Sequence, residues 1–214
     1  MKRKLAILGI AGISLMGSLS VQAQKTEKLF NGKDLSNWEF LVDKNSVPAE
    51  QVYSVKDGMI QIAGQPFGYM YTKQKYSNYK LHVECPDGKE ANSGIFLLIE
   101  DLKNPFPNGV ECQLHAGDAG DFVLLGGSDL AEFQNKPGQP RPAFPVVQKH
   151  TKSSENKAGE WNEANIFVKD GVITVYINGV YQNTGTNKVK EGHIGLQSEG
   201  GPIQFRNVTL TPWE

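Results

Sequence analysis

The chain has 214 residues, of which 39% are hydrophobic, and its formal net charge is −1. This length and apolar content suit one globular domain with its own core. The near balance of charges excludes the strongly basic surface by which proteins bind nucleic acid or anionic membranes. Glycine and proline are frequent and long helical patterns are few, which favours an all-β fold.

The first 23 residues have the pattern of a secretory signal peptide. Lys2–Lys4 are basic, Leu5–Leu19 form an apolar run, and Val21-Gln22-Ala23 resembles a cleavage site. The apolar run is too short and wrongly flanked for a membrane anchor. We therefore expect residues 1–23 to be removed and residues 24–214 to form one periplasmic or secreted domain, with no membrane anchor. Its net charge would be −4, which again argues against nucleic acid as a partner.

In chain order, the first part of this domain predicts short strands joined by tight turns. Residues 29–38 combine an Asn-Gly turn with apolar anchors. Residues 51–64 predict a hairpin about Asp57-Gly58, the residue pair that a type I′ turn requires. Residues 68–85 predict two further strands that are rich in tyrosine. These tyrosines suit either sugar stacking or ordinary half-buried strand packing.

The central stretch predicts two strands, at residues 92–100 and 109–115, on either side of a Pro/Asn/Gly turn. Alternation along the second strand places Glu111, Gln113 and His115 on one face and the intervening apolar residues on the other. One strand would therefore present a carboxylate, an amide and an imidazole to one cavity. A polar solvent face without a role is the alternative.

The two cysteines are expected to be buried thiols. Cys85 and Cys112 both fall on apolar faces of predicted strands. If residues 79–85, 92–100 and 109–115 form a meander, a whole strand separates the two cysteines. Second-neighbour strands are about 9.5 Å apart, which is too far for a disulfide.

The rest of the chain begins with its longest irregular stretch, residues 117–158. Such a stretch either covers or lines a site or packs as a surface loop, and residues 146–150 are candidates to return to a sheet. Residues 161–186 predict a three-stranded meander with turns at Asp170-Gly171 and Asn178-Gly179. Residues 192–210 predict two more strands, the first with Gln197 and Glu199 on one face. Ten to fourteen strands with hardly any helix indicate a two-sheet jelly roll.

Six separated segments occur in the order found in one known family. They are Leu29–Leu35 with Trp38, Asn92–Phe96, Val110–Gln113, Gly159–Asn162, Asn178-Gly179, and Gly195–Gln197 followed by Phe205–Val208. The chain thereby resembles the 3-keto-disaccharide hydrolase family over nearly all of residues 24–214. The resemblance implies an antiparallel jelly-roll sandwich of the concanavalin A-like lectin/glucanase type, whose concave face binds sugar. It also implies action on glycosides oxidised to a ketone at C3.

The chain departs from the family pattern after the E-x-Q strand. Many relatives carry an Asp shortly after this strand and then a Gly-x-x-Tyr-like segment, where this chain has His115 and residues 117–130. The substrate preference and the identity of the acid or base therefore stay open.

The C3 ketone determines which chemistry the site needs. It acidifies the proton on C2 and makes the C1 oxygen a leaving group, so cleavage proceeds by proton abstraction and elimination, with a hydrolase or lyase outcome. This route requires a base, an acid and a donor at the ketone oxygen. The candidate catalytic residues are Glu111, His115 and His150, and the candidate substrate-binding residues are Asn92, Ser93, Gln113, Lys149, Trp161, Gln197 and Glu199.

Several alternatives stay open at this point. A divalent cation held by Glu111, His115 and a second histidine would polarise the ketone, although no compact metal-binding motif supports it. Lys149 would be another electrophilic group. Arg206 is expected to form a structural ion pair with a carboxylate. The main hypothesis is a secreted enzyme that cleaves 3-keto-glycosides. The alternatives are a non-catalytic carbohydrate-binding jelly-roll module and a structural domain. The sequence leaves the oligomeric state open.

Overall fold

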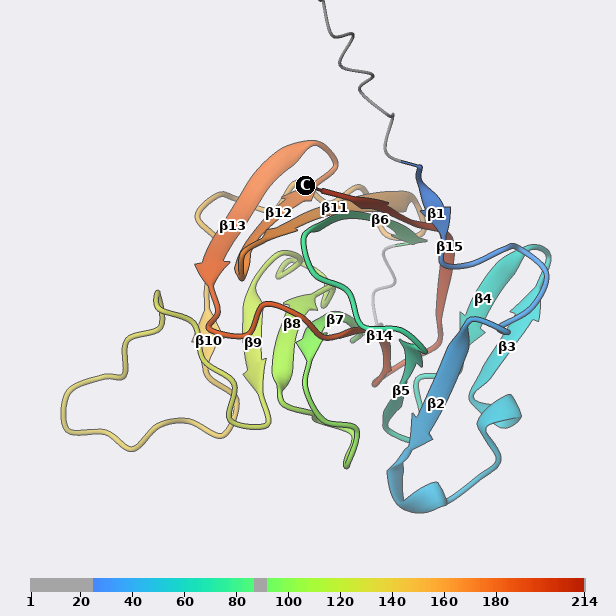
Figure 1. Cartoon of the computed structure of the whole chain (residues 1–214), viewed down its shortest axis with the longest axis horizontal. Helices are drawn as coiled ribbons and strands as arrows, with labels where there is room; N and C mark the ends of the chain where they lie inside the picture. Colours follow the sequence, from blue (N-terminus) through green and yellow to red (C-terminus); the bar gives the residue numbers. More distant parts are fainter. Residues whose placement is uncertain (1–24, 87–91, 214) are drawn as a thin grey trace, which may run out of the picture.

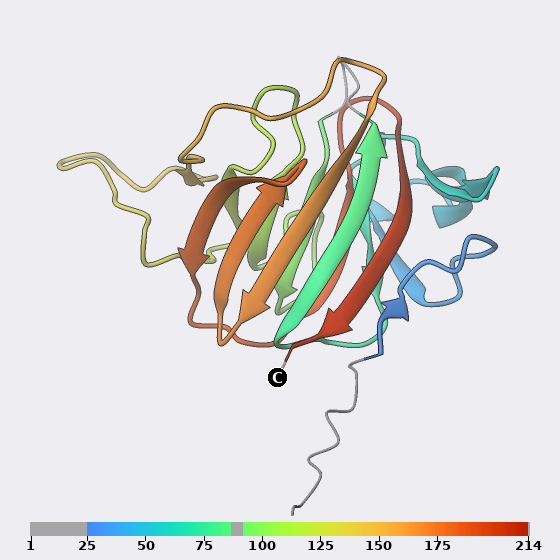
Figure 2. The same cartoon turned by 90° about the horizontal axis from the view of Figure 1, so that it is seen from above.

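The computed structural model describes residues 25–86 and 92–213, which form two facing antiparallel sheets (Figures 1 and 2). The predicted signal peptide lies outside the described residues. Within them, the only helical elements are two short 3-10 turns, Asp43–Asn45 and Ala49–Gln51. No described helix is long and apolar enough to cross a membrane. The predicted all-β, two-sheet fold is confirmed.

One sheet has eight strands. Its order is β13 (Val180–Thr186), β12 (Val172–Ile177), β11 (Trp161–Lys169), β6 (Tyr79–Pro86), β15 (Ile203–Pro212), β4 (Met59–Ile62) and β3 (Tyr53–Lys56), and β1 (Glu27–Lys28) also pairs with β15.

The other sheet has seven strands. Its order is β10 (Val146–Val147), β9 (Phe122–Leu125), β8 (Gly109–Gln113), β7 (Gly94–Ile99), β14 (His193–Ser198), β5 (Gly68–Thr72) and β2 (Trp38–Val42). The pairing of β10 with β9 confirms that residues near 146 return to a sheet.

The tight turns follow the local chemistry that the sequence predicts. Asp57 and Gly58 have φ of 53° and 73°, and the turns at Asp170-Gly171 and Asn178-Gly179 also have positive φ at both positions. Positive φ at both central residues defines the type I′ turn, whose twist matches that of the flanking strands. The predicted hairpin and the meander β11–β12–β13 are therefore confirmed.

The main core lies between the sheets and takes every second residue of the strands. In β8, Val110 and Cys112 are buried in this core, whereas Glu111 points the other way. Trp38 closes the core near the N-terminus, where its indole N–H donates to the Leu29 carbonyl oxygen over 2.9 Å. A second, smaller cluster of Tyr69, Tyr71, Phe96, Ile99 and Leu125 covers the opposite face of the seven-stranded sheet.

The predicted meander of residues 79–115 is wrong. β6 lies between β11 and β15 in the eight-stranded sheet, while β7 and β8 belong to the other sheet. In that sheet β6 pairs with two strands along most of its length, with β11 from Pro86 to Tyr79 and with β15 from Glu84 to Tyr79. The chain therefore crosses between the layers after β6.

Cys85 and Cys112 consequently lie in opposite sheets, on faces that both point into the core. Both are buried thiols and no disulfide joins them, which confirms the predicted redox state on different geometric grounds. Unfolded in denaturant without reductant, the protein should show two titratable thiols with a thiol reagent. A result near zero would contradict this arrangement.

Candidate active site

The candidate site lies on the outer face of the seven-stranded sheet, meaning the face that points away from the eight-stranded sheet. Strand register brings its central residues together: Phe96 pairs with Glu111, and Tyr69 pairs with Gln197. The rings of Tyr69 and Phe96 are 5.4 Å apart. A carboxylate and an amide are thus set among aromatic rings.

Glu111 is the most unusual residue of this face, because its carboxyl group is almost entirely buried, with 4% of the residue exposed. Gly94 makes room for it: a Cβ on Gly94 would lie 2.2 Å from Oε1 of Glu111. Burial, and then the nearby Glu199 carboxylate, raise the pKa of Glu111 to about 8. Among the described residues, none donates a hydrogen bond to this carboxyl group. Glu111 is therefore mainly protonated at neutral pH.

Glu199 is the second acidic group of the site. It follows β14 and is half-buried, and burial raises its pKa while the hydrogen bond from Gln197 lowers it. Nε2 of Gln197 donates to Oε2 of Glu199 over 2.7 Å. The backbone of β14 is fixed in turn by Ser93, whose hydroxyl donates to the Gln197 carbonyl oxygen over 2.9 Å. Ser93 thus positions the strand that carries both groups.

Three buried polar atoms of the site have no hydrogen-bond partner among the described residues. They are Tyr69 OH, Asn92 Oδ1 and Gln197 Oε1. Asn92 adjoins the Glu199 end of the site, since its Cβ lies 2.9 Å from where a Cβ on Gly200 would be. Buried polar atoms are nearly always satisfied in folded proteins. These three atoms are therefore suited to bind hydroxyl groups of a ligand or water.

Loops add an aromatic rim to this face. Leu102 and Phe106, from the loop between β7 and β8, pack against the Tyr69–Phe96 cluster. The Phe106 ring lies 5.8 Å from Phe67 and 5.1 Å from Phe144. Phe67 is 36% exposed and Phe144 is 47% exposed. Part of the long irregular stretch thus reaches the site through Phe144.

Gln113 and His115 have different partners from those expected. Oε1 of Gln113 accepts the backbone N–H groups of Leu114 and His115, over 3.0 and 2.8 Å. Nδ1 of His115 lies 3.1 Å from Oδ2 of Asp118. Gln113 therefore stabilises the turn after β8, and His115 is exposed beyond the end of the strand.

Lys149 joins the same turn. Its Nζ donates to the Gly117 carbonyl oxygen over 2.7 Å, and lies 3.4 Å from Asp121 Oδ1 and 3.8 Å from Asp118 Oδ1. Its charge is thus engaged by the turn that follows β8. The structure brings His115 and Lys149 together around Asp118, but not with Glu111.

His150 contacts the eight-stranded sheet, and Trp161 is part of it. The His150 ring stacks on Tyr181 of β13 at 6.1 Å. Trp161 is the first residue of β11. The Arg206 guanidinium lies over the Trp161 ring, 3.8 Å from the ring centroid. Arg206 forms the expected structural ion pair, at 2.7 Å from Glu84. Neither His150 nor Trp161 is part of the proposed site.

The histidines and acids considered for a cation are not gathered at one point. Within residues 25–86 and 92–213, no group of three His, Cys, Asp or Glu side chains is arranged to hold a metal ion. His193 is the histidine that lies on the same face as Glu111: it contacts the edge of Tyr71 at 5.6 Å and the Thr72 carbonyl oxygen at 2.8 Å. Residues 193 and 197 are an even number of positions apart along β14, which is why both side chains lie on this face.

Comparisons with known proteins agree with this fold. A curated 3-keto-disaccharide hydrolase from Bacteroides thetaiotaomicron is 23% identical, over 90% of this chain and 80% of that protein. A crystal structure of a putative glycosyl hydrolase from Parabacteroides distasonis has a TM-score of 0.64 and 21% identity, covering 88% of this chain and 94% of that one. A Bacillus subtilis carbohydrate-binding module has a TM-score of 0.60 at 12% identity, covering 82% of this chain and 95% of that one.

The family comparison covers nearly all of the described residues. The family model of the 3-keto-alpha-glucoside-1,2-lyase-like domain matches residues 25–211. The match spans both sheets and every residue of the site on the seven-stranded sheet. The chain therefore belongs to the family of 3-keto-α-glucoside-1,2-lyase-like domains.

Proposed function

We propose that this protein is a glycosidase-type enzyme that cleaves glycosides already oxidised to a ketone at C3. The observation that carries the proposal is the buried Glu111 carboxyl group, whose pKa is raised to about 8 beside a second carboxyl group, Glu199. Two neighbouring acids with different environments are the usual means of providing a proton donor and a proton acceptor at one pH. Family membership and the name of the Bacteroides relative support the substrate class.

The first step is removal of the proton on C2 of the oxidised sugar. Glu199, which is half-buried and held by the Gln197 amide, accepts this proton as its carboxylate. Negative charge then develops on the C3 oxygen as the enolate forms. Protonated Glu111 donates toward this charge, as a neutral carboxylic acid in an apolar site can do.

The second step is elimination. The electron pair of the enolate forms the C1–C2 double bond as the C3 carbonyl is restored, and the bond between C1 and the glycosidic oxygen breaks. The leaving oxygen takes up the proton that Glu199 removed from C2, which restores the Glu199 carboxylate. The products are an alcohol and an unsaturated keto-sugar. Addition of water across the double bond completes a net hydrolysis, whereas release at this stage is the lyase outcome.

Binding of the sugar is assigned to the buried polar atoms of the site that have no hydrogen-bond partner in the described part of the chain. Asn92 Oδ1, Gln197 Oε1 and Tyr69 OH are buried without a hydrogen-bond partner among the described residues and match hydroxyl groups of a pyranose. Tyr69 and Phe96 offer ring surface for its apolar face. Gln113 and Lys149 keep structural roles in the turn after β8.

The test is turnover of a 3-keto-glucoside compared with the parent glucoside, followed in deuterated water. We expect release of the aglycone from the keto-substrate alone, with deuterium incorporated at C2 of the sugar product when water has added back. A parallel reaction with a chelator tests the divalent cation that the sequence leaves open. Saturable binding without turnover would instead identify a non-catalytic carbohydrate-binding module, and equal cleavage of the parent glucoside would exclude the elimination route.

A further inference from the structure

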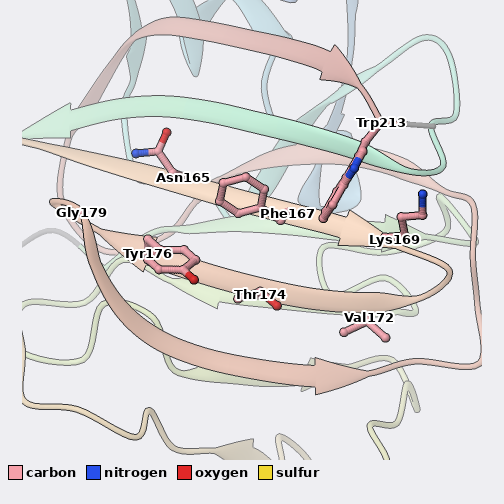
Figure 3. A pocket seen from close by; sticks show the side chains of 8 residues that line it. All are labelled: Asn165, Phe167, Lys169, Val172, Thr174, Tyr176, Gly179 and Trp213. Carbon is pink, nitrogen blue, oxygen red and sulfur yellow. The ribbon is translucent and has the colours of Figure 1, made fainter.

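A groove of about 540 Å³ lies on the outer face of the eight-stranded sheet, on the other side of the sandwich from Glu111 (Figure 3). Strands β11 and β12 form its floor and the segment after β15 forms one wall. Its size falls within the range of about 300–1,000 Å³ that is typical of ligand pockets. Residues that line it include Asn165, Phe167, Lys169, Thr174, Tyr176 and Trp213.

Aromatic side chains line the groove, although the outer face of a sheet is usually polar. In β11 every second residue is buried, including Ile166 and Val168, so Phe167 points outward between them. Phe167 contacts Tyr176 of β12 at 5.6 Å, with the ring planes at 80°. It also contacts Trp213 at 6.0 Å, with the planes at 77°. Figure 3 shows the Trp213 indole standing up from the sheet beside the Phe167 ring.

Trp213 forms one wall of the groove and is anchored although it follows strand β15. Its backbone N–H donates to the Asn78 carbonyl oxygen over 2.7 Å. The ammonium groups of Lys80 and Lys169 lie 5.4 and 5.5 Å from its ring centroid, within the range of cation–π attraction. The backbone hydrogen bond thus anchors residue 213, while Phe167 and both lysines contact its indole ring.

Polar groups complete the lining. Asn165 contributes an amide, Thr174 a hydroxyl and Lys169 an ammonium group, which only donates hydrogen bonds. A ligand that matches this lining has flat apolar faces and many oxygen acceptors along its edges. Pyranose rings have both properties.

We propose that this groove is a second carbohydrate-binding site, which takes an oligosaccharide chain by stacking its rings on Phe167, Tyr176 and Trp213. The site is separate from the acidic site of the seven-stranded sheet and does not depend on the reaction proposed for it. It would keep the protein on a glycan chain while the opposite face remains accessible.

The experiment is calorimetric titration of the full-length chain with maltoheptaose, cellohexaose and an oligogalacturonate. We expect at least one of these to bind saturably, and Trp213→Ala or Phe167→Ala to weaken that binding about tenfold or more, as loss of an aromatic contact predicts. The matched control is Trp161→Ala, which removes an indole from the same sheet face but outside the groove, and which should leave the affinity unchanged. Thermal melts of each variant check that the fold is retained.

Several results would overturn the proposal. One is the absence of binding by all three oligosaccharides at millimolar concentration. Another is binding that both groove variants leave unchanged. A third is a concentration-dependent dimer in sedimentation experiments that Trp213→Ala abolishes, because the groove would then be an interface with a second copy of the chain.

Discussion

Glu111→Gln should make the protein inactive on 3-keto-glucosides and at the same time more stable at alkaline pH. Turnover should fall by about 10² to 10⁴, the usual effect of removing a general acid or base. The free energy of unfolding should rise because the folded protein resists ionisation of this carboxyl group, whose pKa is about 8 instead of the ordinary 4.5. Catalytic groups commonly lower the stability of the folded protein while they support its activity.

The sign of the pH effect follows from proton linkage. Since the pKa is raised on folding, the folded state binds more protons between about pH 4.5 and pH 8, and wild-type stability falls across this window as pH rises. Below this pH window the carboxyl group is protonated in both the folded and the unfolded state. Above the window it is ionised in both states, and the loss of stability is constant. The loss is about 5 kcal/mol at most, which corresponds to roughly 10–20 °C in Tm for a chain of this size.

Thermal melts at pH 5 and pH 9 provide the measurement. The Tm of the wild type should drop more steeply between these values than that of Glu111→Gln, and the two proteins should differ most at pH 9. Glu100→Gln is the control, because it removes an exposed carboxyl group just after β7. Parallel pH curves for wild type and Glu111→Gln would show that the carboxyl group is hydrated, and would remove the basis for its role as a proton donor.

Gly94→Ala should abolish most of the activity although it replaces no side chain that reacts. The new methyl group would lie 2.2 Å from Oε1 and 2.7 Å from Cδ of Glu111, so the buried carboxyl group must move. Displacing a catalytic group by about 1 Å can cost on the order of 10²-fold in rate. Overpacking of this kind should also lower the free energy of unfolding by about 1–3 kcal/mol. Steady-state kinetics and urea unfolding measure the two effects.

The control for this variant is Gly109→Ala. Gly109 lies on the same strand and face as Glu111, but a Cβ there meets the Leu97 carbonyl oxygen at 3.1 Å and Ile99, not the carboxyl group. It should therefore lose some stability while keeping most of its turnover. Full activity in Gly94→Ala would mean that the carboxyl position is not critical.

Local sequence signals were sufficient for the strands, the turns and the orientation of Glu111. The turn pairs Asp57-Gly58 and Asn178-Gly179 specify their hairpins, because both residues adopt positive φ. Alternation along the strand places Val110 and Cys112 in the core and Glu111 on the outer face. These features depend only on neighbours in the chain.

Features that depend on distant partners were not predictable in this way. β6 joins the other sheet because β11 and β15 offer it long registers, which no local pattern reveals. His115 leaves the face of Glu111 because the strand ends at Gln113, whose side chain caps the next two N–H groups. His150 and Trp161 belong to segments that pair with the eight-stranded sheet, so a list of polar residues could not separate them from the true neighbours of Glu111.

The position of β15 has a consequence for how the molecule is made. This final strand lies between β6 and β4, and the opening strand β1 pairs with it as well. The eight-stranded layer therefore cannot close until β15 has been synthesised, because without β15 the strands β6, β4 and β1 each lack a partner. Such late, long-range closure also implies slow folding, on a timescale of milliseconds to seconds.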